Sequence, residues 1–234
     1  MRPLLLVPAL LLSLAAAAPS TAAGQAEDDR PGIAVLPFSN GGSLGPNRED
    51  LEPLRVGVQQ MLLTELAQNP ALRIVERSAL AEVMEEQDLA ASGRVDARTA
   101  ARVGKLVGAR YVVTGGFVDL YGTFRLDGRI VDVETGEVLR SEQVRDRKER
   151  LYDLLVQMAG KITRDVRLPP LPRAVQQARQ ARRIPTEAAT LYSKALLYQD
   201  RGEKDKAVEL YRSIAERFPE MTEAREALRQ LSET

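Results

Sequence analysis

Apolar residues follow two different patterns in the first part of the chain. Gly32–Phe38 is a short continuous apolar run, which is typical of a strand buried on both faces. From Leu51 to Leu66 the apolar residues recur at spacings of three and four, which predicts an amphipathic helix. Leu72–Val75 is a second short apolar run and predicts a second strand.

Capping residues mark two further helices. Ser78 is predicted to cap a helix that ends at Gln87, and Asp96 to cap a helix that ends at Val107. Gly108 follows at the position where a left-handed residue commonly ends a helix.

Longer strands and a last helix complete this unit. Tyr111–Leu120 is rich in Val, Tyr and Phe and predicts a strand. Phe124–Val133 is predicted to pair with Val138–Val144 across a three-residue turn that ends in Gly136. Leu151–Val166 has helical periodicity. This order predicts an α/β or α+β fold over residues 32–166, with helices flanking a mixed sheet.

Prolines and arginines fill the segment 167–184. The prolines at 169, 170 and 172 cannot continue a helix, so a linker is predicted here. Its second part carries arginines and no acidic residue: Arg173, Arg179, Arg182 and Arg183. A solvated linker helix is the favoured interpretation, and a cationic surface that binds a partner is the alternative.

Residues 185–234 predict a helical hairpin. Small, aromatic and proline residues fall at the positions of a helix-turn-helix repeat of about 34 residues: Ala195, Tyr198, Gly202, Ala207, Tyr211 and Pro219. This segment resembles one tetratricopeptide repeat followed by a partial helix. One repeat buries little apolar surface, so it must lean on the main domain, on the preceding segment or on another chain. Tyr198, Ala207 and Tyr211, with the four arginines, are the candidate partner-binding residues.

The N-terminus has the layout of a secretory signal. Residues 1–23 combine Arg2, an apolar run of about 15 residues and an Ala-rich end. That run is short for a membrane span of about 20 residues, which favours a cleaved signal over an uncleaved anchor. The polar residues 24–31 are predicted to be a disordered lead-in. We therefore expect an exported, periplasmic protein whose membrane association is at most peripheral.

Composition excludes several classes of chemistry. The chain has 33 Lys and Arg, 33 Asp and Glu, and neither His nor Cys. Catalysis by Ser-His-Asp or Cys-His, zinc sites of His and Cys, and disulfides are all excluded. The zero net charge gives no general attraction to nucleic acid. No cofactor is expected.

Carboxylates on the predicted strands are the remaining catalytic candidates. Asp119, Asp127, Asp132 and Glu134 could supply an acid–base pair. The favoured alternative is that they lie on the solvent side of an antiparallel sheet and pair with Arg125, Arg129 and Arg140.

A family resemblance covers roughly residues 32–166. The stretch Arg73–Gly116 combines VERS, EQ, SG, D-x-x-T-A and VGKLVGARYVVTG in order, together with GIAVLPF and RIVDVETGEVL. It resembles the CsgG-type curli production assembly/transport family, whose core is shared with FlgO- and LpoB-type proteins. The resemblance implies an envelope protein with a small mixed sheet flanked by helices. The chain lacks the family's lipidated cysteine and its long membrane-spanning insertions, so only the soluble domain carries over.

These observations predict a non-enzymatic envelope protein that serves assembly, transport or scaffolding through protein–protein contacts. Its partners would be envelope proteins or further copies of the chain, in the periplasm or at the outer membrane. An activator of a cell-wall synthase, as in the LpoB-type relatives, is the first alternative. A carboxylate-dependent hydrolase is the second.

Overall fold

The structure is a computed structural model that describes residues 28–45, 51–86 and 95–233. The strands are β1 (Gly32–Val35), β2 (Ser39–Asn40), β3 (Arg73–Ile74), β4 (Tyr111–Leu120), β5 (Thr123–Asp132) and β6 (Val138–Arg147). The helices are α1 (Leu54–Ala67), α2 (Arg77–Glu86), α3 (Ala97–Leu106), α4 (Leu151–Asp165), α5 (Arg173–Ala181), α6 (Thr186–Asp200), α7 (Lys204–Arg217) and α8 (Thr222–Glu233), with a short 3₁₀ helix at Lys148–Arg150.

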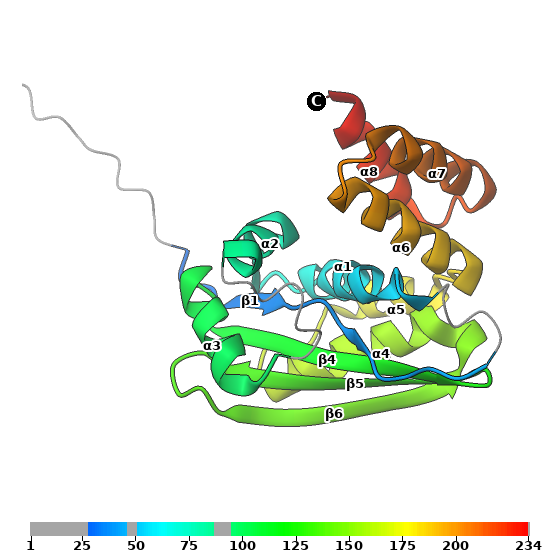
Figure 1. The fold of residues 1–234 in the computed structure, drawn as a ribbon. Coiled ribbons are helices and arrows are strands. Elements are labelled where there is room, and N and C mark those ends of the chain that lie inside the picture. The colour runs from blue at the N-terminus through cyan, green and yellow to red at the C-terminus, as the bar shows by residue number, and fades with distance from the viewer. Residues whose placement is uncertain (1–27, 46–50, 87–94, 234) are drawn as a thin grey trace, which may run out of the picture.

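The strands form one mixed sheet in the order β3-β1-β4-β5-β6, and β2 also pairs with β4. β1 is parallel to β3 and β4, whereas β5 is antiparallel to both of its neighbours, β4 and β6. Gly115 of β4 lies opposite Gly128 of β5 near the centre of the sheet. The predicted fold class, helices on a mixed sheet followed by a helical C-terminal part, is confirmed (Figure 1).

Turn glycines behave as the sequence predicts. Gly136 has a φ of 72° in the β5–β6 turn, and Gly108 has a φ of 64° after α3. Both values lie in the left-handed region that glycine adopts without steric cost. Asp96 caps α3, because its side chain accepts a hydrogen bond of 2.7 Å from the backbone N–H of Thr99.

Three predicted boundaries differ from the structure. α2 begins at Arg77, so Ser78 lies inside the helix and the predicted Ser78 cap is wrong. The carbonyl of Glu76 already accepts the N–H of Leu80, at 3.2 Å, which starts the helix earlier. The predicted loop after β1 contains β2, which forms by pairing with β4, and β6 extends to Arg147 along β5. The predicted helix end at Gln87 lies outside the described residues.

The N-terminal lead-in is partly ordered. Residues 24–27 lie outside the described part, but Arg30 donates hydrogen bonds to the carbonyls of Pro70 and Leu72 and pairs with Asp28. The predicted disorder over 24–31 therefore does not extend over Asp28–Arg30.

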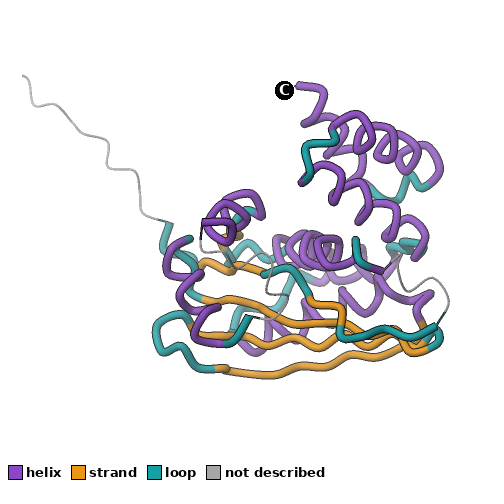
Figure 2. Tube along the Cα trace, in the orientation of Figure 1, coloured by secondary structure: helices purple, strands orange, loops and turns teal. Residues whose placement is uncertain are grey.

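Two apolar clusters lie on opposite faces of the sheet. α1 and α4 cover one face, where Leu154 is fully buried as the helical periodicity predicts. α2 and α3 cover the other face, around Leu36 and Val112. Figure 2 shows the strands as one layer in the lower part of the view, with the C-terminal helices at the opposite end of the molecule.

α6 packs on α1, on its side away from the sheet, α7 packs on α6, and α8 packs on α7 (Figure 1). α1 and α6 approach closely because Gly57 lies against Ser193, and a Cβ atom at Gly57 would meet Ser193 Oγ at 1.7 Å. The first apolar cluster runs without a break from the sheet through Leu62 to Tyr211 and Ala224. The helices α6, α7 and α8, which we call the repeat after their resemblance in the sequence, therefore share the core of the main domain and lean on its surface.

Candidate functional site

The segment that carries the four candidate arginines joins the main domain to the repeat. α5 begins directly after Pro172, whose missing N–H is tolerated at a helix start. Arg173 and Arg183 are exposed, as a solvated helix predicts. Arg179 and Arg182 are not solvated, because both form ion pairs with carboxylates of other helices. The solvated-helix interpretation therefore accounts for Arg173 and Arg183, whereas Arg179 and Arg182 are held by carboxylates within the chain, which neither interpretation predicts.

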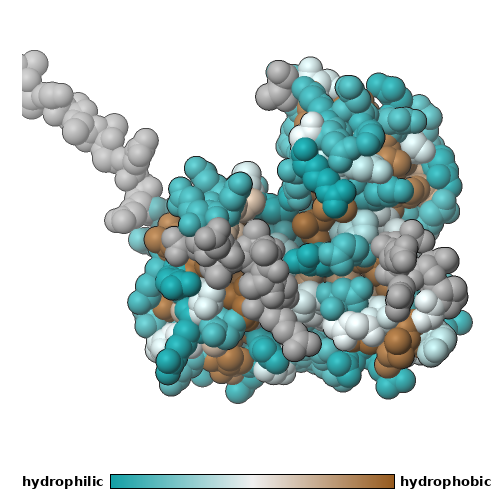
Figure 3. All heavy atoms as spheres, in the orientation of Figure 1, coloured by the Kyte–Doolittle hydropathy of each residue, from teal (hydrophilic) through white to brown (hydrophobic). Residues whose placement is uncertain are grey.

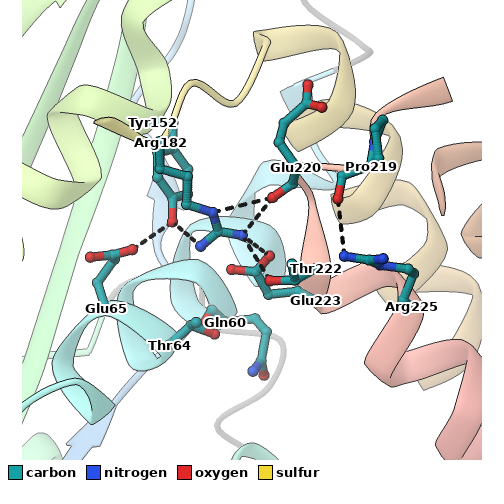
Figure 4. A network of polar contacts seen from close by, with 10 residues as sticks. All are labelled: Gln60, Thr64, Glu65, Tyr152, Arg182, Pro219, Glu220, Thr222, Glu223 and Arg225. Atoms are coloured by element: carbon teal, nitrogen blue, oxygen red, sulfur yellow. Dashed lines mark hydrogen bonds and ion pairs between the residues drawn. The ribbon is translucent and has the colours of Figure 1, made fainter. Parts of the chain in front are cut away.

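Arg182 lies at the centre of a polar network between α1, α4 and α8 (Figure 4). Its Nη1 donates to the hydroxyl of Tyr152 at 2.7 Å, and that hydroxyl donates to Glu65 Oε1 at 2.5 Å. Its Nη2 pairs with Glu223 Oε2 and donates to the carbonyl of Glu220 at 3.1 Å. One guanidinium therefore connects two helices of the main domain with the last helix of the chain.

Arg179 extends this network from the other side of Glu65. Its Nε donates to Glu65 Oε2 at 2.5 Å, and the Glu65 side chain is only 2% exposed. Two guanidinium groups thus balance the carboxylates of Glu65 and Glu223. Paired charges of this kind can be buried, whereas an unpaired one would carry a large desolvation cost.

The network controls the charge state of its members. Burial raises the pKa of the Tyr152 phenol far above its ordinary value, and the negative charge of Glu65 raises it further. Burial is the largest single effect on Arg182 and opposes its charged form, but the hydrogen bond to Glu223 and the negative charges of Glu223 and Glu65 together outweigh it, so the net pKa is raised. Tyr152 therefore remains a neutral donor and Arg182 a cation across the physiological pH range.

Two polar atoms in this network lack a hydrogen-bond partner within the described residues. They are Arg179 Nη2 and Glu223 Oε1, both buried. Buried donors and acceptors normally have partners, because leaving one unpaired costs free energy. The network therefore retains capacity for one further acceptor and one further donor.

The candidate residues of the repeat occupy different environments. Ala207 and Tyr211 are fully buried between α6 and α7, and the Tyr211 ring lies 5.8 Å from that of Tyr192. Their side chains form the core of the hairpin and do not reach the surface. Tyr198 is half-buried, and Lys206 lies over its ring at 5.2 Å. The structure thus brings Arg179 and Arg182 together but leaves the three repeat residues apart from them.

A cleft of about 550 Å³ opens beside the network. We call it the repeat cleft. Its walls come from α1 and α2 on one side and from α6 and α8 on the other, and Arg182 and Glu223 are part of its lining. Figure 3 shows a notch between α2 and the C-terminal helices, with hydrophilic residues along its rim. Arg77 Nη1 crosses this gap and contacts both carboxylate oxygens of Asp200 at 2.6 Å.

A second cleft, of about 630 Å³, lies on the open part of the sheet. Thr114, Arg125 and Asp127 line it, together with Ser141 and Gln143 of the edge strand. Asp127 accepts hydrogen bonds from Arg125 at 2.9 Å and from Gln143 at 2.7 Å. The predicted pairing of Asp127 with Arg125 is present.

The strand carboxylates do not converge in one place. Asp119 pairs with Lys148 at 3.2 Å, and Asp132 pairs with Arg110 at 2.6 Å rather than with Arg129. Asp132 lies opposite Tyr111, and Tyr111 is eight residues from Asp119 along β4. The two aspartates are therefore about 26 Å apart along the strand direction. Glu134 joins Asp132 at Arg110. These residues therefore stabilise the two ends of the sheet.

Sequence reasoning missed Glu65, Tyr152 and Glu223. For Glu65 the sequence contains one indication, because this charged residue lies between Leu62 and Leu66 on the apolar face of α1. For Tyr152 and Glu223 the sequence contains no such indication, since a tyrosine beside a leucine and an acidic residue at a helix start are both common.

In the described part of the chain, the helices α6–α8 are fixed on a mixed α/β domain by a shared apolar core and a buried polar network. Residues 15–123 match the family model described as "Curli production assembly/transport component CsgG". The match contains Arg73–Gly116, the stretch that carries the resemblance in the sequence, and it confirms that resemblance over residues 32–123 of the predicted range 32–166.

Solved structures show only distant likeness. The LpoB C-terminal domain from Salmonella enterica is 21% identical, with 50% of this chain and 83% of that one covered, at a TM-score of 0.39. TolB from Acinetobacter baumannii is 19% identical, and the match covers 60% of this chain and 29% of that one, at a TM-score of 0.43. The chain of a PelC dodecamer from Paraburkholderia phytofirmans is 16% identical, and the match covers 59% of this chain and 89% of that one, at a TM-score of 0.35. No curated protein matches the chain. At this level of similarity none of these structures bears on its function.

Proposed function

We propose that the chain is a non-enzymatic adaptor of the cell envelope, which acts through protein–protein contacts made by the CsgG-type domain and the repeat as one rigid unit. The observation that carries this proposal is the buried network around Arg182. It fixes the repeat on the main domain and leaves a polar cleft between them. A fixed cleft of this kind loses little conformational entropy when a partner binds.

The state of the acidic residues supports a non-enzymatic role. Asp119 and Asp132 are each held by a cation, and about 26 Å separates their positions on the sheet. Glu65 and Glu223 are held by Arg179 and Arg182. A general acid–base pair needs two carboxyl groups close to one substrate bond. These carboxylates instead serve structural ion pairs.

The location in the envelope is supported by the sequence and by the family. Residues 1–23 have the layout of an export signal, and the matching family model describes an assembly and transport component. Among the described residues, no helix has the length and apolarity needed to cross a membrane.

The test is to tag the full chain at its C-terminus, cross-link intact cells, and identify co-purifying proteins from the envelope fraction by mass spectrometry. We expect a reproducible set of envelope proteins and a mature N-terminus between Pro19 and Glu27. Purified protein should release nothing from isolated cell-wall material.

Two results would contradict the proposal. Recovery of the chain alone, with Met1 intact and in the cytosol, would rule out an envelope adaptor. Release of sugars or peptides from the wall material would restore the hydrolase.

A further inference from the structure

β6 is the outer strand of the sheet, at the lower edge of the view in Figure 1, and it pairs with β5 alone. The N–H of Lys148, directly after β6, donates to the carbonyl of Gly122, so the main chain of Lys148 is directed toward β5. Main-chain groups alternate in direction along a strand, and the register with β5 is continuous up to this point. The N–H and C=O groups of Ser141, Gln143 and Arg145 are therefore directed outward and have no strand partner in the described part of the chain.

Arginines lie on the open face of the sheet beside this edge. Residues that are opposite each other on neighbouring strands share a face, so Arg129 lies beside Ser141, Arg125 beside Arg145, and Thr123 beside Arg147. This is the face that carries the second cleft. The paired positions of β5 and β6 on this face hold four arginines and one acidic residue, namely Arg125, Arg129, Arg145, Arg147 and Asp127.

The charge of this face is not balanced within the described part of the chain. Both carboxylate oxygens of Asp127 are used, one by Arg125 at 2.9 Å and the other by Gln143 at 2.7 Å. Arg129, Arg145 and Arg147 are exposed, and their side chains form no ion pair with a described residue. Arg145 also lies directly opposite Arg125, and like charges at such positions destabilise a sheet.

The acidic residues of β6 do not compensate these arginines. The side chains of Glu142 and Asp146 lie on the other face of the sheet, because side chains alternate along a strand. Glu142 is paired with Lys161, and Asp146 is paired with Arg150 at 2.8 Å. The free charges at this edge of the open face are therefore all positive.

A free strand edge beside unpaired cations suits an extended acidic segment. Such a segment can join a sheet through main-chain hydrogen bonds, and its alternate side chains then lie on one face. Every second residue of an added strand would lie beside Arg145 or Arg147, where a carboxylate is the complementary group. The positive charge disfavours a second copy of the same strand at this edge.

We propose that β6 binds an extended acidic segment of a partner protein as a further strand of the sheet. The main chain of that segment pairs with Ser141, Gln143 and Arg145, and two of its carboxylates, at alternate positions, meet Arg145 and Arg147. A carboxylate beside Arg145 also offsets its repulsion with Arg125. This inference rests on the proposed adaptor function and adds the place of contact and the chemistry of the partner.

The test measures the binding of labelled ten-residue peptides to residues 24–234. The peptides consist of Thr and Val and carry two Glu at alternate positions, two Glu at adjacent positions, or two Lys at alternate positions. We expect the alternate-Glu peptide to bind at least tenfold more tightly than the alternate-Lys peptide. The adjacent-Glu peptide has the same charge but can place only one carboxylate on the open face, so it should bind about threefold more weakly than the alternate-Glu peptide.

Arg145→Gln should weaken binding of the alternate-Glu peptide about three- to fivefold, the upper range for an exposed ion pair. Its melting temperature should not fall, because the variant also removes a like-charge pair. Arg212→Gln is the matched control, since Arg212 is exposed on α7 and forms no ion pair with a described residue. It should bind all three peptides as the wild type does.

Amide hydrogen exchange, followed by NMR, tests the main-chain contact. The N–H groups of Ser141, Gln143 and Arg145 should exchange rapidly in the free chain and become protected when the alternate-Glu peptide binds. Equal binding of Glu and Lys peptides, no binding of any peptide, an equal loss in Arg212→Gln, or no new protection at these amides would overturn the inference. So would tighter binding of a soluble polyuronate than of the alternate-Glu peptide, which would indicate a site for an acidic glycan.

The same variants separate this inference from the proposed function in cells. If Arg145→Gln captures the same envelope proteins as the wild type, the adaptor stands and its contact surface lies elsewhere. If the wild type itself captures no envelope protein, the adaptor function fails.

Discussion

At the scale of single residues, the decisive groups are charged side chains in apolar surroundings. Glu65 lies in the sequence among the leucines of α1, so the pattern alone indicates that its carboxylate needs a partner. Its partners Tyr152 and Arg179 are 87 and 114 residues away. Periodicity is a local signal and cannot specify contacts of that range, which is why the network was not predictable.

Replacing Glu65 by glutamine should destabilise the chain. The variant removes the charge that faces Arg179 and leaves a buried guanidinium without its counter-ion. We expect the free energy of unfolding to fall by about 3 kcal/mol, as for other buried ion pairs that lose one member. Urea denaturation followed by circular dichroism measures the difference.

Glu187→Gln provides the control for this experiment. Glu187 pairs with Arg217, and their side chains are 59% and 50% exposed. Exposed pairs contribute about 0–1 kcal/mol. A loss for Glu65→Gln no larger than the loss for Glu187→Gln would mean that the buried network does not hold the two parts together.

Alkaline pH should destabilise the folded chain through its buried tyrosines. Burial raises the pKa of Tyr192 well above its ordinary value, so the folded state keeps the phenol protonated. The unfolded state ionises near pH 10, and stability is therefore complete below about pH 10 and falls above it. Urea midpoints between about pH 9 and 11 should decline less steeply for Tyr192→Phe than for the wild type.

Tyr121→Phe is the matched control, because Tyr121 is 77% exposed. Its midpoints should follow those of the wild type at every pH. Identical slopes for Tyr192→Phe and the wild type would show that the Tyr192 phenol ionises as readily in the folded chain as in the unfolded one.

At the scale of elements, the sequence predicts those whose cause is local. β4 has the predicted bounds, and the Asp96 cap of α3 and the left-handed Gly136 are as expected, since each depends on neighbouring residues. β2 and the extension of β6 depend instead on pairing with β4 and β5. Such strands arise from tertiary context, and a single sequence carries little sign of them.

The packing of α6 on α1 depends on the absence of a side chain at Gly57. In Gly57→Ala the new Cβ would lie 2.4 Å from the Cβ of Ser193, so α6 must move away. We expect a loss of about 1–3 kcal/mol in the free energy of unfolding, as for other overpacked cores. This loss exceeds the gain of about 0.5–1 kcal/mol that alanine brings to a helix interior.

Two further variants make this test specific. Gly160 of α4 has no atom within 4 Å of an added Cβ, so Gly160→Ala should be neutral or stabilising. Ser193→Gly in the Gly57→Ala background should restore part of the lost stability, which a double-mutant cycle measures. Additive losses would mean that the two helices do not meet at these residues.

At the scale of the whole molecule, the prolines and the core give different divisions of the chain. The prolines at 169, 170 and 172 predict a boundary, and the backbone indeed leaves the helical conformation there. The apolar cluster nevertheless continues from the sheet through α1 into α6, α7 and α8. A proline indicates where a helix must end, so the sequence predicts the break between α4 and α5. A shared core depends on which surfaces meet in the folded chain, and the sequence does not predict that.

A charge placed inside the repeat should therefore destabilise the sheet as well. Ala207 is fully buried between α6 and α7, and Ala207→Glu would bury an unpaired carboxylate there at a cost of several kcal/mol. Because the core is shared, hydrogen exchange should accelerate for the amides of β4 and β5 together with those of α6 and α7. Lys204→Glu, at the exposed start of α7, introduces the same side chain without burial and should leave both regions protected. Faster exchange confined to α6–α8 would contradict a shared core. A fragment of residues 173–234 that is monomeric and unfolds cooperatively would contradict it too, because a repeat that depends on α1 cannot remain folded without α1.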